Sequence, residues 1–140
     1  MKILIADDEE SIIEVVNLDL EKEGYSVLTA LDGDTALELE IAEKPDLLIL
    51  DIMLPKMSGL ELCRAIEREV PVIFLAAKTS EEDKIAGFAL GADDYITKPF
   101  SPRELIARVK AVMRRSNLAG TDGIISVDGM SIDLNNKNVK

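Results

Sequence analysis

Charged side chains that could do chemistry follow three apolar runs of this sequence. Asp7 and Asp8 come directly after one run, Asp51 ends a second, and Lys98 follows a third. If the runs are parallel strands, their carboxyl ends lie at one edge of a sheet, where open α/β sheets bind ligands. Three clustered carboxylates stay ionised only beside positive charge, which a divalent hard cation and Lys98 would supply. Taken alone, Asp7-Asp8 would be a helix cap and Asp51 a turn residue.

The apolar runs have the composition of strands that are buried in a parallel sheet. Residues 47–50 are four apolar residues in a row, too few for a helix, and Pro55 follows shortly afterwards. Similar strands are expected at residues 2–6, 25–29, 71–75 and 95–97. Between them, helical spacing and capping residues predict helices at about residues 9–23, 34–43, 58–66, 79–91 and 101–115.

The strict alternation of five strands with five helices predicts an α/β fold. Short connections and right-handed crossovers favour a doubly wound five-stranded parallel sheet, with helices on both faces, over roughly residues 1–115. Periodicity alone does not fix the order of the strands. The order 2-1-3-4-5 is preferred because it places the first and third strands side by side, which brings Asp7, Asp8 and Asp51 together.

Composition excludes several other functions. The formal charge of −11 argues against a nucleic-acid-binding surface on this chain. The sequence has no histidine, which excludes histidine-based acid–base catalysis and histidine-ligated metal sites. The single cysteine, Cys63, permits no internal disulfide. No run of about 18 apolar residues exists, and the chain begins with a strand rather than a signal peptide. We therefore expect a cytoplasmic protein without a membrane span.

Three motifs of the sequence resemble the receiver domain of two-component response regulators. They are Asp7-Asp8, the segment 51–59 and the segment 91–100. The resemblance covers residues 1 to about 115 and implies a flavodoxin-like receiver fold. The last motif and the residues after it, to Arg115, are further similar to the winged-helix (OmpR/PhoB-type) subfamily of transcriptional response regulators.

The resemblance implies a role for each charged residue. Asp51 would be the phosphoacceptor, taking a phosphoryl group from a phosphohistidine of a partner sensor histidine kinase. Asp8, Asp51 and the backbone carbonyl of Met53 would bind Mg²⁺ directly, and Asp7 would bind it through water, a ligand set that Mg²⁺ prefers. Lys98 would hold a phosphoryl oxygen, and the peptide bond after it is cis in most receivers.

One position departs from the receiver pattern. The fourth strand of receivers usually ends in Thr or Ser, whose hydroxyl binds the phosphoryl group, and here that residue is Ala76. In receivers an aromatic residue, here Tyr95, turns inward behind the hydroxyl during switching. Phosphorylation of Asp51 would survive the substitution, whereas the switch would be impaired. Natural drift and a designed, uncoupling substitution both explain Ala76.

Four charged residues have two alternative explanations: Lys84, Asp94, Glu104 and Arg108. Most charge runs are simply solvated surfaces. By resemblance, these residues would instead pair across a two-fold homodimer built from the fourth helix, fifth strand and fifth helix. Lys84 would pair with Glu104, and Asp94 with Arg108, because an isologous interface suits self-complementary charges.

The C-terminal residues change in composition. Residues 116–123 are rich in Gly, Ser, Asn and Asp and are expected to form a linker. Residues 124–140 alternate around Asp128-Gly129, which predicts a β-hairpin. The hairpin resembles the beginning of a winged-helix effector domain, so we expect a truncated chain. Binding to DNA would then belong only to the missing part of that domain.

Two other classes of function compete with a phosphoacceptor receiver. An aspartyl phosphatase of the haloacid dehalogenase type would need a second Asp two residues after Asp51, where this chain has Met53. We therefore expect no enzyme beyond a domain that assists its own phosphorylation and dephosphorylation. The alternative is a pseudo-receiver that binds proteins independently of phosphorylation, which Ala76 favours but the intact Asp51 and Lys98 disfavour.

Overall fold

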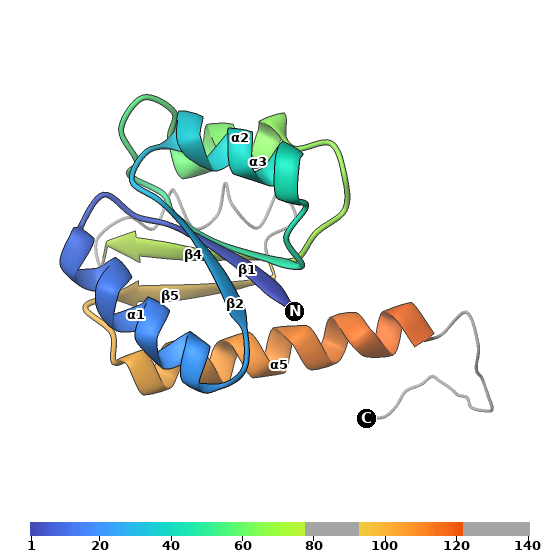
Figure 1. The fold of residues 1–140 in the computed structure, drawn as a ribbon. Coiled ribbons are helices and arrows are strands. Elements are labelled where there is room, and N and C mark those ends of the chain that lie inside the picture. Colours follow the sequence, from blue (N-terminus) through green and yellow to red (C-terminus); the bar gives the residue numbers. More distant parts are fainter. Residues whose placement is uncertain (78–92, 122–140) are drawn as a thin grey trace. The chain divides into compact units, whose positions relative to one another are not determined.

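The computed structural model describes residues 1–77 and 93–121 of the chain (Figure 1). Its elements in chain order are β1 (Lys2–Ala6), α1 (Glu10–Lys22), β2 (Ser26–Ala30), α2 (Gly33–Glu43), β3 (Leu47–Asp51), α3 (Gly59–Ala65), β4 (Val72–Ala77), β5 (Asp94–Lys98) and α5 (Pro102–Thr121). The helix expected at residues 79–91, the residue Lys84 and the hairpin expected at 124–140 lie outside the described residues. The chain divides into the units Met1–Val109 and Lys110–Lys140, and the first holds all of the sheet.

The five strands form one parallel sheet in the order β2-β1-β3-β4-β5, as predicted. In the register of β1 against β3, Ala6 lies opposite Leu50. Asp7 and Asp51, the residues that follow these two, therefore leave the sheet at the same edge. At the other side of the sheet, Lys98 ends β5 opposite Ala77 of β4. Parallel strands thus carry all the predicted charged residues to one edge.

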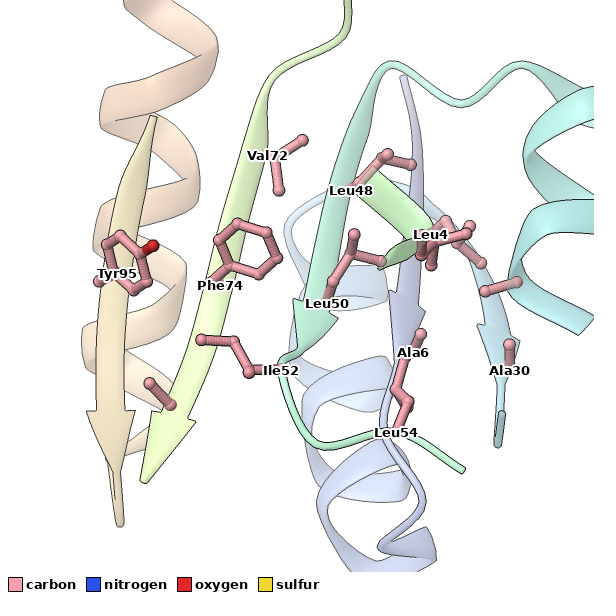
Figure 2. Close-up of a cluster of buried hydrophobic side chains, with 13 residues drawn as sticks. Leu4, Ala6, Ala30, Leu48, Leu50, Ile52, Leu54, Val72, Phe74 and Tyr95 are labelled. Atoms are coloured by element: carbon pink, nitrogen blue, oxygen red, sulfur yellow. The ribbon is translucent and has the colours of Figure 1, made fainter. Parts of the chain in front are cut away.

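The core lies on both faces of the central strands. All five residues of β3 are buried, which confirms that it is a strand covered on both sides. Figure 2 shows a cluster of buried hydrophobic side chains, in which Leu4, Leu50 and Phe74 come from three neighbouring strands. The helix α1 contributes Ile13, Val16 and Leu20, the helical spacing expected from the sequence. The helices α2 and α3 cover the opposite face of the sheet from α1 (Figure 1).

Two helix ends differ from the prediction. The helix α5 continues to Thr121, whereas the sequence predicted an end near Arg115 and a linker from residue 116. Leu118 and Ala119 favour helix, while the glycines that suggested a linker come only at positions 120 and 123. The helix α3 ends at Ala65, so Ile66, the last residue of the predicted helix, is the C-cap residue and packs against the core from there.

None of the helices in the described ranges, 1–77 and 93–121, is long and apolar enough to cross a membrane.

Candidate functional site

Lys98 lies at the centre of the charged cluster. Its ammonium nitrogen is 2.8 Å from Oδ2 of Asp51 and 2.9 Å from Oδ2 of Asp7. A third carboxylate, that of Glu9, lies 3.0 Å from the same nitrogen. Burial lowers the pKa of Lys98, but the adjacent carboxylates of Asp51, Asp7 and Glu9 together outweigh burial and hold the pKa well above its usual value. Lys98 is therefore a fixed positive charge at the sheet edge.

Asp7 is a fully buried carboxylate at the end of β1. Its Oδ1 accepts a hydrogen bond of 2.9 Å from the backbone N–H of Glu9. Its Oδ2 is close to the Lys98 ammonium but out of line for a hydrogen bond, so it lacks a hydrogen-bond donor among the described residues. Burial raises the pKa of Asp7, and the Glu9 N–H and Lys98 only partly oppose this. A cation, or a water molecule bound to it, would supply the missing partner of this buried carboxylate oxygen.

Three carboxylates at this edge can act together as ligands. Oxygen atoms of Asp7, Asp8 and Asp51 all lie within 4.8 Å of one another. Asp7 and Asp51 are buried, and Asp8 is exposed, so the cluster opens to solvent on one side. Hard oxygen ligands with an open side fit a cation that retains several waters, as Mg²⁺ does. The donor set therefore fits the predicted metal.

The loop after β3 holds the Asp51 side chain in place. Oδ1 of Asp51 accepts a hydrogen bond of 3.0 Å from the backbone N–H of Met53, a residue that is 68% exposed. The loop then returns to the strand, because the N–H of Gly59 donates to the carbonyl of Ile52 at 2.9 Å. A Cβ on Gly59 would collide with the backbone carbonyl of Asp51, so only glycine permits this close approach.

A capping box fixes the start of α3 beyond this loop. The Ser58 hydroxyl accepts from the Glu61 N–H at 3.1 Å, and the Glu61 carboxylate accepts from the Ser58 N–H at 3.0 Å. The segment Ser58-Gly59 is therefore both a helix start and a contact with the strand that carries Asp51.

Ala76 and Tyr95 lie on the neighbouring strands β4 and β5. Ala76 is buried, one position beyond Leu75, which pairs with Asp51. Tyr95 is 8% exposed, and its ring lies against that of Phe74, with centroids 5.5 Å apart (Figure 2). The Tyr95 ring is thus buried on the sheet in a chain that has only a methyl group at position 76.

Three of the four residues expected at a dimer face come together within one chain. The Arg108 guanidinium donates to both oxygens of Asp94, at 2.9 and 3.0 Å. Glu104, one turn before Arg108 on the same helix, lies 3.7 Å from its other terminal nitrogen. The pairing of Asp94 with Arg108 expected between two chains is therefore also possible inside one.

Glu9 is the member of the site that the sequence did not reveal. The sequence predicts Glu9 only as the first residue of a helix. In the structure it is the N-cap of α1, with extended backbone angles, and its side chain reaches back to Lys98. Its position directly after Asp7-Asp8 indicated that it lies near the charged cluster. Its residue type did not indicate a contact with Lys98. The peptide bond between Lys98 and Pro99 is cis, as the resemblance implied.

Comparison with known proteins identifies the class to which this fold and site belong. The sequence-family model of the response regulator receiver domain matches residues 3–110 of this chain. The chain belongs to this family, and it is the receiver domain of a two-component response regulator. Receiver domains are signalling domains, and the resemblance stated from the sequence is confirmed.

Individual relatives support the same conclusion. The alkaline phosphatase synthesis transcriptional regulatory protein PhoP of Bacillus subtilis (strain 168) is 51% identical over 132 residues, which are 92% of this chain and 55% of that protein. The chain thus spans about half the length of this relative. The solved receiver domain of Francisella response regulator 1452 is 39% identical, with a TM-score of 0.76, over 82% of this chain and 98% of that one. Chemotaxis protein CheY4 of Vibrio cholerae is 35% identical, with a TM-score of 0.74, over 79% and 97%.

Proposed function

We propose that this chain is cytoplasmic and that its Asp51 accepts a phosphoryl group from a phosphohistidine on a sensor histidine kinase, in a reaction that requires Mg²⁺. The observation that carries this proposal is the contact of the Lys98 ammonium with the Asp51 carboxylate, beside two further carboxylates at the same strand edge. A nucleophile, a fixed cation and a set of metal ligands then lie within reach of one phosphoryl group.

The chemistry requires positioning and charge neutralisation more than covalent help. An Asp51 oxygen attacks phosphorus while the bond from phosphorus to the kinase histidine breaks, and the histidine nitrogen leaves with the bonding electrons. The Met53 N–H and the Lys98 ammonium orient the Asp51 carboxylate for this attack. Lys98 then neutralises a phosphoryl oxygen, which lowers the energy of the charged transition state.

The metal would be held by Asp8, Asp51 and the backbone carbonyl of Met53, and by Asp7 through water. When bound, Mg²⁺ draws negative charge from the transferring phosphoryl group. The buried Oδ2 of Asp7, which lacks a hydrogen-bond donor among the described residues, supports a place for a metal-bound water. The chain itself would be no enzyme beyond promoting its own phosphorylation and dephosphorylation.

The output would be dimerisation and DNA binding by a longer protein. We place the receiver domain at residues 1–115, a linker at 116–123 whose first residues continue α5 to Thr121, and the beginning of a winged-helix effector domain in 124–140. The relative that is 51% identical is a transcriptional regulatory protein, which supports this arrangement. Phosphorylation would favour a homodimer through helix 4, strand 5 and helix 5, with Lys84, Asp94, Glu104 and Arg108 at its interface. Ala76 would weaken the link from Asp51 to this interface.

Labelling with a small-molecule phosphodonor tests the proposal. Acetyl phosphate with Mg²⁺ should give an acid-labile phosphoryl group on the wild-type chain, and a chelator or Asp51→Asn should abolish it. Asp46→Asn is the matched control, since Asp46 is an exposed aspartate just before the same strand. Equal labelling of Asp51→Asn and wild type would overturn the assignment. A wild-type chain that takes no label would be a pseudo-receiver, a phosphorylation-independent binding module.

A further inference from the structure

Lys98 has a third carboxylate neighbour that the proposed reaction does not use. Glu9 Oε1 lies 3.0 Å from the Lys98 ammonium, close to the distances of Asp51 and Asp7. The three carboxylates differ sharply in exposure. The side chains of Asp7 and Asp51 are 0% and 7% exposed, whereas that of Glu9 is 57% exposed. Glu9 therefore reaches the ammonium from the solvent side and can leave it at little cost.

The backbone of Glu9 is fixed even though its side chain is exposed. Its N–H donates to Oδ1 of the buried Asp7, and its carbonyl accepts from the N–H groups of Ile12 and Ile13 in the first turn of α1. The side chain thus extends from an anchored backbone to the Lys98 ammonium. The contact with Lys98 is a property of this anchored cap rather than of a freely moving surface residue.

We propose that Glu9 is a positioning residue, which holds Lys98 in the resting site and competes with the phosphoryl group for it. The proposal rests on the proposed function, because it assigns a regulator to the same phosphoacceptor site. A lysine ammonium has three N–H donors, and here three carboxylates lie between 2.8 and 3.0 Å from it, with hydrogen bonds to Asp51 and Glu9. A phosphoryl oxygen on Asp51 needs one of these N–H donors, and the exposed Glu9 is the partner that yields.

The competition has opposite consequences for the two ligands of the site. The Glu9 charge lies near the metal ligands, so it favours a cation. The same charge repels a phosphoryl group and holds Lys98 away from it. Removing the charge by Glu9→Gln should weaken Mg²⁺ binding by about twofold and tighten binding of a phosphoryl mimic by about threefold, since partly exposed ion pairs have modest energies. A residue with only a structural role would change both affinities in the same direction.

Calorimetric titration can measure both affinities in the full chain. Mg²⁺ alone is titrated first, and beryllofluoride is then titrated at saturating Mg²⁺, for wild type, Glu9→Gln and Glu10→Gln. The Glu10 variant removes the same charge one residue further along, at the first position of α1. A double variant, Glu9→Gln with Lys98→Met, tests whether the gain passes through Lys98.

Opposite shifts in Glu9→Gln, which are absent from Glu10→Gln and lost in the Lys98→Met background, would support the proposal. Unchanged affinities, or equal shifts in Glu9→Gln and Glu10→Gln, would overturn it while leaving the phosphoacceptor site intact. A wild-type chain that fails to bind beryllofluoride at all would overturn the proposed function itself, and the role of Glu9 with it.

Discussion

At the scale of single residues, the site buries negative charge that lowers the stability of the folded protein. Asp7 is fully buried, and Oδ2 of its carboxylate lacks a hydrogen-bond donor among the described residues. Lys98 offsets part of this charge but is shared with Asp51 and Glu9. A buried charge that is only partly compensated destabilises the folded state. We therefore expect the buried charge of Asp7 to lower the free energy of unfolding of the metal-free protein.

Asp7→Asn should stabilise the metal-free chain by about 1 kcal/mol at neutral pH, because the amide keeps an acceptor for the Glu9 N–H without a buried charge. Urea denaturation in the presence of a chelator measures the free energy of unfolding. The same variant should bind Mg²⁺ more weakly. A loss of stability in Asp7→Asn would contradict the view that the buried carboxylate charge destabilises the folded protein when no metal is bound.

The pH dependence of this gain follows from the direction of the Asp7 pKa. Burial raises the pKa of Asp7 in the folded state above its ordinary value of 3.8. The penalty is therefore fully present above the folded pKa, and it disappears as the pH falls through that value toward 3.8. The stability difference between Asp7→Asn and wild type should shrink over the same acidic range.

At the scale of elements, α3 is the support of the phosphoacceptor strand. Gly59→Ala should lower stability by about 1–3 kcal/mol, because its Cβ would meet the Asp51 carbonyl and the backbone of Ile52. The displaced backbone would also slow labelling of Asp51 by acetyl phosphate. Gly24→Ala is a useful control, since its φ of 94° strains the chain in open space, away from any neighbour. Both variants should lose stability, but slow labelling in Gly24→Ala as well would show that stability alone controls the rate.

A second support joins α2 to the segment after α3. Glu40 of α2 is 4% exposed and accepts a hydrogen bond of 2.8 Å from Arg68, which also donates to the carbonyl of Pro45. Arg68→Met should cost about 2–4 kcal/mol, because it leaves the Glu40 carboxylate buried without a cation. Adding Glu40→Gln to Arg68→Met should recover part of the loss in the same denaturation assay. If the double variant recovers no stability, the loss of the Glu40–Arg68 ion pair is not the cause of the destabilisation in Arg68→Met.

The sequence predicted the strands, their order and the meeting of Asp7, Asp51 and Lys98 at one edge of the sheet. Asp7, Asp51 and Lys98 were predictable because each follows a buried strand, and parallel strands end at one edge. The contact of Glu9 with Lys98 was not predictable, because it depends on the backbone angles of the α1 cap. The end of α5 was predicted wrongly, because the residues after Arg115 include both helix-favouring residues and residues typical of linkers.

At the scale of the whole molecule, the open question is the connection from Asp51 to a dimer. Tyr95 is already buried against Phe74 beside Ala76. Restoring a hydroxyl by Ala76→Thr should strengthen dimerisation in the presence of beryllofluoride and Mg²⁺, because the hydroxyl would couple the phosphoryl group to the Tyr95 ring. Light scattering with and without the mimic measures the solution mass of both chains. Equal dimerisation of wild type and Ala76→Thr would show that the hydroxyl is dispensable.

The most direct test of the central claim is a crystal structure of this chain with Mg²⁺ and beryllofluoride. We expect beryllium bonded to an Asp51 oxygen and a fluorine in contact with the Lys98 ammonium. We also expect the metal on Asp8, Asp51 and the Met53 carbonyl. A beryllofluoride group bound elsewhere, or one on Asp51 with Lys98 turned away from it, would contradict the account.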